Sequence, residues 1–345
     1  MAENQILTVR GPLEPAKLGS TLIHEHLLFD LTCYFTEPAD DKGKTRAREP
    51  IQLNNLGWVR RNSMSSLHNL KMLEEELATT EAGRFRDAGG QAIVDQTING
   101  IAPQPEGLRR ISSATGLHIV AGSGYYIFPS HPADMDEKTV PGITDEIVGC
   151  VEKGINGTDV RAGLIGEIGA SWPLHPNEEK CLHAAARAHL ETGAPISIHP
   201  GQSPNSPMQV LDLLRRDGVD PERVIMSHVD ARFREHIDLY RHLADTGCKL
   251  SFDTFARDIY YPMLGRQHPS DNLRVDVVAE LVRRGFLDSI MVAQDCCYRM
   301  DLTAFGGYGY AHILEHILPR LRAHGVTDND ISGIMVANPA RFLAF

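Results

Sequence analysis

Histidine and carboxylate side chains stand at the ends of short apolar runs, in positions where several of them can meet. The run from Thr21 ends in His24-Glu25-His26, and four further runs end in an acid or a histidine. Alternate side chains of a strand share a face, so His24 and His26 are expected to point together into the protein, and Glu25 to point away toward surrounding helices. The complete set is His24, His26, Glu167, His199, His228 and Asp295.

Four imidazoles and two carboxylates form a ligand set for divalent metal ions. Six protein groups exceed the three that a catalytic zinc ion usually takes, so the sequence predicts two ions that share Glu167. Two ions about 3.5–4 Å apart can lower the pKa of a water toward ~7 and polarise a carbonyl or phosphoryl oxygen. Asp295 is then expected to accept the proton of the attacking water. We predict zinc, although manganese, cobalt and iron accept the same ligands.

Each of these residues also has a structural interpretation. His199 could bond to the turn that follows it, and His228 could be a satisfied core histidine. Asp295 could cap the next segment, and Glu167 could pair with Arg161. Burial of unpaired charges at the ends of apolar strands would be costly, and a metal centre relieves that cost for all six residues at once. The metal interpretation is therefore favoured.

The elements that carry these residues alternate between strands and helices, which predicts a TIM (β/α)8 barrel formed by one domain over residues 1–345. Active sites of such barrels lie at the C-terminal ends of the strands, where the six residues occur. The predicted strands are Thr21–His26, Gln91–Gln96, His118–Gly124, Gly163–Ile168, Pro195–His199, Arg223–His228, Lys249–Asp253 and Ser289–Asp295. The predicted helices are Ser66–Asp87, Asn177–Thr192, Met208–Asp217, Glu235–Thr246, Val275–Arg284 and Ile313–His324, with Asn177 as a capping residue.

A polar, charged stretch from Tyr34 to Pro50 follows the first strand and is expected to be a long loop over the top of the barrel. Loops at this end of a barrel shape the substrate pocket.

Composition limits the possible partners. The net charge is −11, from 34 basic and 45 acidic residues, which argues against nucleic acid and anionic membrane surfaces. No run of about 18 apolar residues predicts a membrane span, and the N-terminal segment does not read as a signal peptide. The six cysteines form no C-x-x-C pair, so reduced thiols and a cytoplasmic location are expected. The oligomeric state stays open, with a homodimer as one option.

Several stretches resemble the phosphotriesterase family of the amidohydrolase superfamily, and most closely the phosphotriesterase-related branch found in animals. The resemblance covers nearly the full length. The matching stretches are Leu13–Pro15, Gly19–His26, Leu164–Gly169, Ser171–Leu174, Ile198–Gly201, Met226–His228 and Gly306–Tyr310.

The resemblance implies that His24, His26 and Asp295 hold a buried ion, and that His199 and His228 hold a more exposed ion. Bacterial phosphotriesterases bridge the ions with a carboxylated lysine, whereas this chain has Glu167, which argues against efficient turnover of organophosphates. For this branch, the resemblance implies hydrolysis of N-acetyltaurine, a small N-acyl substrate, to taurine and acetate. A sulfonate needs cations or hydrogen-bond donors, and the candidates are Arg232 and Arg299 first, then Tyr126, Asn62, His68 and Tyr308.

Two other functions remain open on the sequence alone. A lactonase, an esterase or a weak phosphotriesterase could use the same two ions, and it would differ in its pocket. A binding protein without catalysis should have lost at least one ligand, and the sequence retains all six.

Overall fold

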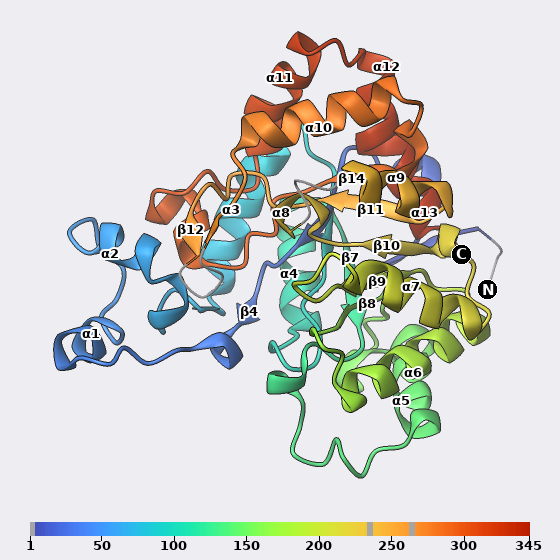
Figure 1. The fold of residues 1–345 in the computed structure, drawn as a ribbon, viewed down its shortest axis with the longest axis horizontal. Coiled ribbons are helices and arrows are strands. Elements are labelled where there is room, and N and C mark those ends of the chain that lie inside the picture. The colour runs from blue at the N-terminus through green and yellow to red at the C-terminus, as the bar shows by residue number, and fades with distance from the viewer. Residues whose placement is uncertain (1–3, 233–236, 262–265) are drawn as a thin grey trace.

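The computed structural model describes residues 4–232, 237–261 and 266–345, and it confirms the barrel (Figure 1). Eight parallel strands form one sheet in the order β14-β11-β10-β9-β8-β7-β6-β3. The sheet nearly closes, because the N–H of Asp295 after β14 donates to the carbonyl of His24 in β3 at 3.2 Å. The strands are β3 (Thr21–Glu25), β6 (Ala92–Asp95), β7 (His118–Ser123), β8 (Leu164–Gly169), β9 (Ile196–His199), β10 (Val224–Met226), β11 (Lys249–Phe252) and β14 (Ile290–Val292).

These strands are short apolar runs with no exposed residue, as expected of a parallel sheet that is covered on both faces. Two of them carry an irregularity next to a candidate ligand. The β3–β6 register shifts between Leu22 and Glu25, and the β8–β9 register shifts between Ile165 and Ile168. Strand pairing is therefore irregular beside the candidate ligands.

Helices between the strands cover the outside of the barrel (Figure 1). Their ends carry recognisable signals: α4 and α6 each begin with proline in the first turn and end at a glycine in the left-handed conformation, Gly116 and Gly193. The longer helices are α3 (Glu75–Asp87), α4 (Pro105–Thr115), α5 (Val140–Glu152), α6 (Pro176–Thr192), α7 (Ser206–Arg216), α9 (Ile237–Asp245) and α10 (Asp271–Arg283). The shorter ones are α8 (Val229–Arg232), α11 (Leu318–Ala323), α12 (Asp328–Ser332) and α13 (Asn338–Leu343).

The segment after β3 is more structured than a loop. It contains α1 (Asp41–Arg46) and α2 (Leu56–Arg61), and it projects from the body of the protein on the left of Figure 1. The short strands β4 (Phe29–Asp30) and β5 (Lys71–Met72) pair antiparallel at its base. The expectation of a plain loop over Tyr34–Pro50 is therefore wrong. Helix α1 forms within this stretch, and Asp40 caps it by accepting from the N–H of Gly43.

Several helix boundaries also differ from the predictions; α7 and α10, for example, begin at Ser206 and Asp271, before the predicted Met208 and Val275. The helix predicted from Ser66 begins only at Glu75, because Lys71–Met72 form β5 at the base of the projecting segment. The cap of α6 is His175, whose ring accepts from the N–H of Asn177, so Asn177 lies inside the helix. The predicted helix from Ile313 begins with a π-helical turn over Ile313–Ile317. Helix α11 follows this turn, and Pro319, which has no N–H to donate, lies in the first turn of α11. The predicted start at Glu235 lies outside the described residues.

The two ends of the described chain lie together, since Gln5 and Phe345 exchange both backbone hydrogen bonds. Two antiparallel hairpins complete the strands: β1 (Ile6–Thr8) with β2 (Gly11–Leu13), and β12 (Tyr260–Tyr261) with β13 (Arg266–Gln267). Among the described residues, no helix is both long and apolar enough to cross a membrane.

Candidate metal centre

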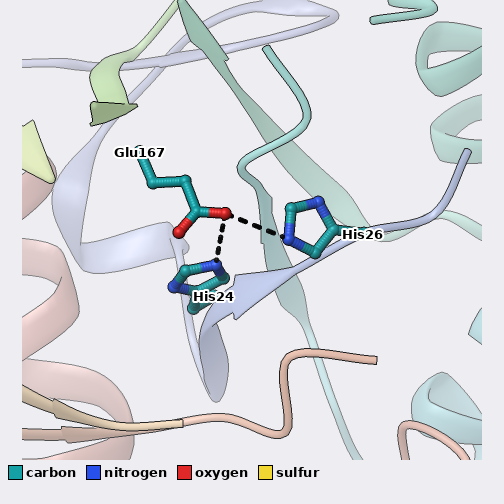
Figure 2. Close-up of side chains that lie close together, drawn as sticks. All are labelled: His24, His26 and Glu167. Atoms are coloured by element: carbon teal, nitrogen blue, oxygen red, sulfur yellow. Dashed lines mark ion pairs between the residues drawn. The ribbon is translucent and has the colours of Figure 1, made fainter. Parts of the chain in front are cut away.

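The six predicted ligands meet at the C-terminal ends of the barrel strands, around the carboxylate of Glu167. One oxygen, Oε1, lies 3.5 Å from His24 Nε2 and 3.4 Å from His26 Nε2 (Figure 2). The other oxygen, Oε2, lies 2.9 Å from His199 Nδ1 and 3.2 Å from His228 Nε2. Each oxygen of one carboxylate thus faces its own pair of imidazoles.

Asp295 lies beside the first pair. Its Oδ1 is 3.3 Å from His26 Nε2 and 3.9 Å from His24 Nε2. Two groups of donor atoms therefore share Glu167, one with His24 and His26 and the other with His199 and His228. All six side chains are buried.

The backbone brings Glu167 to this position through Gly166. A side chain there would place its Cβ 2.2 Å from the carbonyl oxygen of Ser197, and its φ of +127° suits only glycine. His228 and Asp295, the second and third residues beyond their strands, also adopt positive φ, at +55° and +50°. Non-glycine residues in this region cost about 1–3 kcal/mol each and concentrate at functional sites.

Asp253, which we did not select from the sequence, lies behind two of the imidazoles, and Ser227 Oγ also lies 3.1 Å from Nδ1 of His24. Its Oδ2 lies 3.0 Å from His24 Nδ1, and its Oδ1 lies 2.9 Å from His228 Nδ1. The Nε2 atoms of both rings then face Glu167. A carboxylate behind the second nitrogen of a histidine is the common arrangement at metal sites, because it fixes the ring and its tautomer. Asp253 directly follows β11, and its position at the end of a predicted strand was the signal available in the sequence.

Glu25 has a different role from the one expected. It was predicted to face the helices, but its Oε1 and Oε2 accept the backbone N–H groups of Gln294 and Cys296, each at 2.8 Å. These two residues flank Asp295, so Glu25 fixes the segment that presents this carboxylate. Burial raises the pKa of Glu25 to about 8, against the two backbone N–H groups, which lower it.

The buried carboxylates and histidines of the cluster favour the binding of a cation. Burial lowers the pKa of His26, but Asp295 and Glu167 outweigh it and raise that pKa to about 9. Burial would raise the pKa of Glu167, yet His24 and His199 hold it well below its usual range. Nε2 of His24 is buried and has no hydrogen-bond partner among the described residues. Divalent ions bound at about 2.0–2.2 Å from nitrogen and oxygen fit between donor atoms that lie close to 3 Å apart.

The predicted substrate-binding residues do not all lie at the cluster. Tyr126 reaches the cluster, with its hydroxyl 3.2 Å from His199 Nδ1 and 2.9 Å from the hydroxyl of Tyr34. Tyr308 is exposed and lines a cavity next to Asp295. Asn62 donates to the carbonyl of Trp58.

Two of the remaining three candidates bind other parts of the protein. The side chain of the third is not among those that the structure describes. His68 accepts from the N–H of Ile51 at 3.1 Å. Arg299 binds the carboxylate of Glu74 at 2.5 and 2.6 Å, away from the cluster. Arg232 ends α8, and its side chain lies outside the described part of the chain. A residue missed from the sequence, Arg257, instead contacts Asp295 at 2.8 Å.

Comparison with known proteins agrees with this architecture. The family model of the phosphotriesterase family matches residues 4–343. An N-acetyltaurine hydrolase of Salmo salar is 39% identical over 99% of this chain and 98% of its own length. An N-acetyltaurine hydrolase of Homo sapiens is 36% identical over the same shares. The crystal structure of a resiniferatoxin-binding protein from Rhodobacter sphaeroides superposes with a TM-score of 0.95 at 38% identity, covering 98% of this chain and 94% of that one.

Proposed function

This chain belongs to the phosphotriesterase family and is a hydrolase, and we propose that it hydrolyses the amide bond of N-acetyltaurine to give taurine and acetate. The observation that carries the proposal is the sharing of the Glu167 carboxylate between two pairs of imidazoles. The full-length similarity to N-acetyltaurine hydrolases supports the choice of substrate.

We assign two divalent ions, preferably zinc, to the cluster. His24, His26 and Asp295 would hold one ion, His199 and His228 the other, and Glu167 both. When bound, such a pair supplies a polarised carbonyl and a water of lowered pKa. The whole chain, residues 1–345, would serve this centre as one domain.

The side chains around the ions have separate tasks in the reaction. Water adds to the acetamide carbon, the C–N bond breaks, and the proton of the water passes to the amine nitrogen. Asp295 is the proposed acceptor of that proton. Burial raises its pKa, but Arg257 and then His26 hold the pKa well below its usual range, so the carboxylate is ionised before the reaction. The hydroxyl of Tyr126, beside His199, can donate to the carbonyl oxygen.

The sulfonate end requires donors away from the ions. Tyr308 and Arg232 are the first proposed contacts, and Asn62 and His68, which bond to the backbone of Trp58 and Ile51, come second. Arg299 is the weakest of the sequence candidates, because Glu74 already neutralises it.

The test compares substrates on protein loaded with metal. We expect turnover of N-acetyltaurine to exceed that of simple lactones and of a phosphotriester, and Glu167→Gln to abolish it. Faster turnover of lactones than of N-acetyltaurine would favour the lactonase alternative and would overturn the proposed substrate.

A further inference from the structure

The five residues 253–257 directly follow β11, and we call them the β11 segment. The side chains at its two ends contact candidate metal ligands. Asp253 lies within 3.0 Å of two ligand imidazoles, and Arg257 lies 2.8 Å from Asp295. Three of the six candidate ligands therefore contact this one segment, and its shape decides where these two side chains lie.

The β11 segment belongs to no helix or strand, so its shape depends on other groups. Ala256 has a φ of +71°, which a residue with a side chain keeps only when its surroundings impose it. Two carboxylates accept three backbone N–H groups of the segment. Asp230 accepts from Asp253 at 3.3 Å and from Thr254 at 3.1 Å. Asp271 accepts from Ala256 at 2.9 Å.

Arg274 on α10 joins these two carboxylates. Its side chain is 1% exposed. Nε lies 2.8 Å from Oδ2 of Asp230, and Nη1 lies 3.2 Å from Oδ1 of Asp271. Nη2 donates to the hydroxyl oxygen of Thr254 at 2.9 Å and to the carbonyl of Arg257 at 3.4 Å. Each nitrogen of the guanidinium therefore bonds to the β11 segment or to a carboxylate that holds it.

The chemistry of this buried cation favours a role in geometry. A buried ion pair often adds little net stability over apolar side chains of the same volume, because both charges lose their hydration. A guanidinium presents its five N–H donors in fixed directions of one plane, whereas the ammonium of a lysine presents three from one nitrogen. Arg274 can therefore hold Asp230, Asp271 and Thr254 at once, and a lysine cannot.

We propose that Arg274 is a positioning residue for the metal centre. It fixes the shape of the β11 segment, and thereby places Asp253 behind two imidazoles and Arg257 beside Asp295. Arg274 touches neither substrate nor ion, and its effect reaches the centre through these two side chains. The inference goes beyond the proposed function, because it concerns the affinity and geometry of the ions, whichever substrate is hydrolysed.

The test replaces Arg274 by lysine, which keeps a positive charge near Asp230 but loses the planar fork. Arg274→Lys should weaken zinc binding about tenfold or more, measured by competition with a chelator on folded protein. It should also change the visible absorption spectrum of the cobalt-loaded protein, which reports the geometry around the ions. Leu214→Ala is the control, since it removes apolar volume from the core under α7. It should lower the denaturation midpoint but leave zinc affinity and the cobalt spectrum unchanged.

A merely structural role gives the opposite pattern. If Arg274→Lys lowers the denaturation midpoint but keeps the zinc affinity and cobalt spectrum of the wild type, the proposal is overturned. If Arg274→Lys does not fold, Thr254→Val decides, because it removes the hydroxyl bonded to Nη2 and retains the charges of Arg274 and Asp230. Weaker zinc binding by Thr254→Val supports the proposal, and wild-type affinity overturns it.

These readouts do not depend on the substrate. A wild type that binds zinc but does not hydrolyse N-acetyltaurine would overturn the proposed function and leave the role of Arg274 standing. A wild type that binds no zinc would overturn both.

Discussion

The two nitrogens of His228 face two different carboxylates: Nδ1 lies 2.9 Å from Asp253 and Nε2 lies 3.2 Å from Glu167. His24 repeats the pattern, with Nδ1 at 3.0 Å from Asp253 and Nε2 at 3.5 Å from Glu167. One buried carboxylate therefore lies behind two imidazoles whose Nε2 atoms face a second carboxylate.

Asp253→Asn should weaken metal binding about 10- to 100-fold, because the neutral amide no longer holds both imidazoles by charge. Competition with a chelator measures the affinity. Asp245→Asn, an exposed change at the end of α9, is the matched control. Unchanged affinity in Asp253→Asn would mean that the strands alone fix the two rings.

Asp295→Asn should retain part of the metal and lose most of kcat. The amide oxygen can still be a ligand, but the amide cannot accept the proton of the attacking water. Steady-state kinetics are compared with metal content in the same samples, with the surface variant Asp288→Asn as control. A rate that falls only in proportion to occupancy would make Asp295 a ligand without a role as a base.

Glu25→Gln should lower both metal occupancy and turnover, by about tenfold or more. The amide offers one acceptor where the carboxylate offers two, so either Gln294 or Cys296 loses the acceptor of its N–H. Elemental analysis and activity provide the readout, with the exposed Glu14→Gln as control. Normal occupancy in Glu25→Gln would show that the segment around Asp295 holds its position without this side chain.

Arg274→Met should destabilise the protein by about 3–5 kcal/mol, since it leaves the charge of Asp230 buried without its partner. Arg274 is 1% exposed and its Nε lies 2.8 Å from Asp230 Oδ2. Denaturant unfolding measures the effect. Arg283→Met on the same helix removes an exposed arginine and should change stability by less than about 0.5 kcal/mol; equal unfolding free energies of the two variants would refute the expected cost.

The barrel and the convergence of the six candidate ligands were predictable from the sequence because both follow from local patterns. An apolar run that ends in His199, His228 or Asp295 predicts both a strand and a candidate ligand at its end. Asp253 had the same signal at the end of the seventh predicted strand, but we selected no residue from that strand.

The other features of the site depend on contacts between segments that are distant in the chain, and the spacing of residues in the sequence does not specify these contacts. Glu25 was assigned to the wrong surroundings because its partners, the N–H groups of Gln294 and Cys296, lie 269 and 271 positions away. The pairing of Arg299 with Glu74 joins residues 225 positions apart. Arg257 reaches Asp295 from a segment 38 positions earlier, and no local motif marks it as part of the site.

The number of divalent ions bound per chain tests the central claim most directly. Protein stripped with a chelator is titrated with zinc, and bound metal and N-acetyltaurine hydrolysis are measured in the same samples. We predict no activity without metal, full activity at two ions per chain, and a loss of both ions' affinity in Glu167→Gln, because one carboxylate serves both. Full activity with one ion per chain, or with none, would contradict the shared-carboxylate centre.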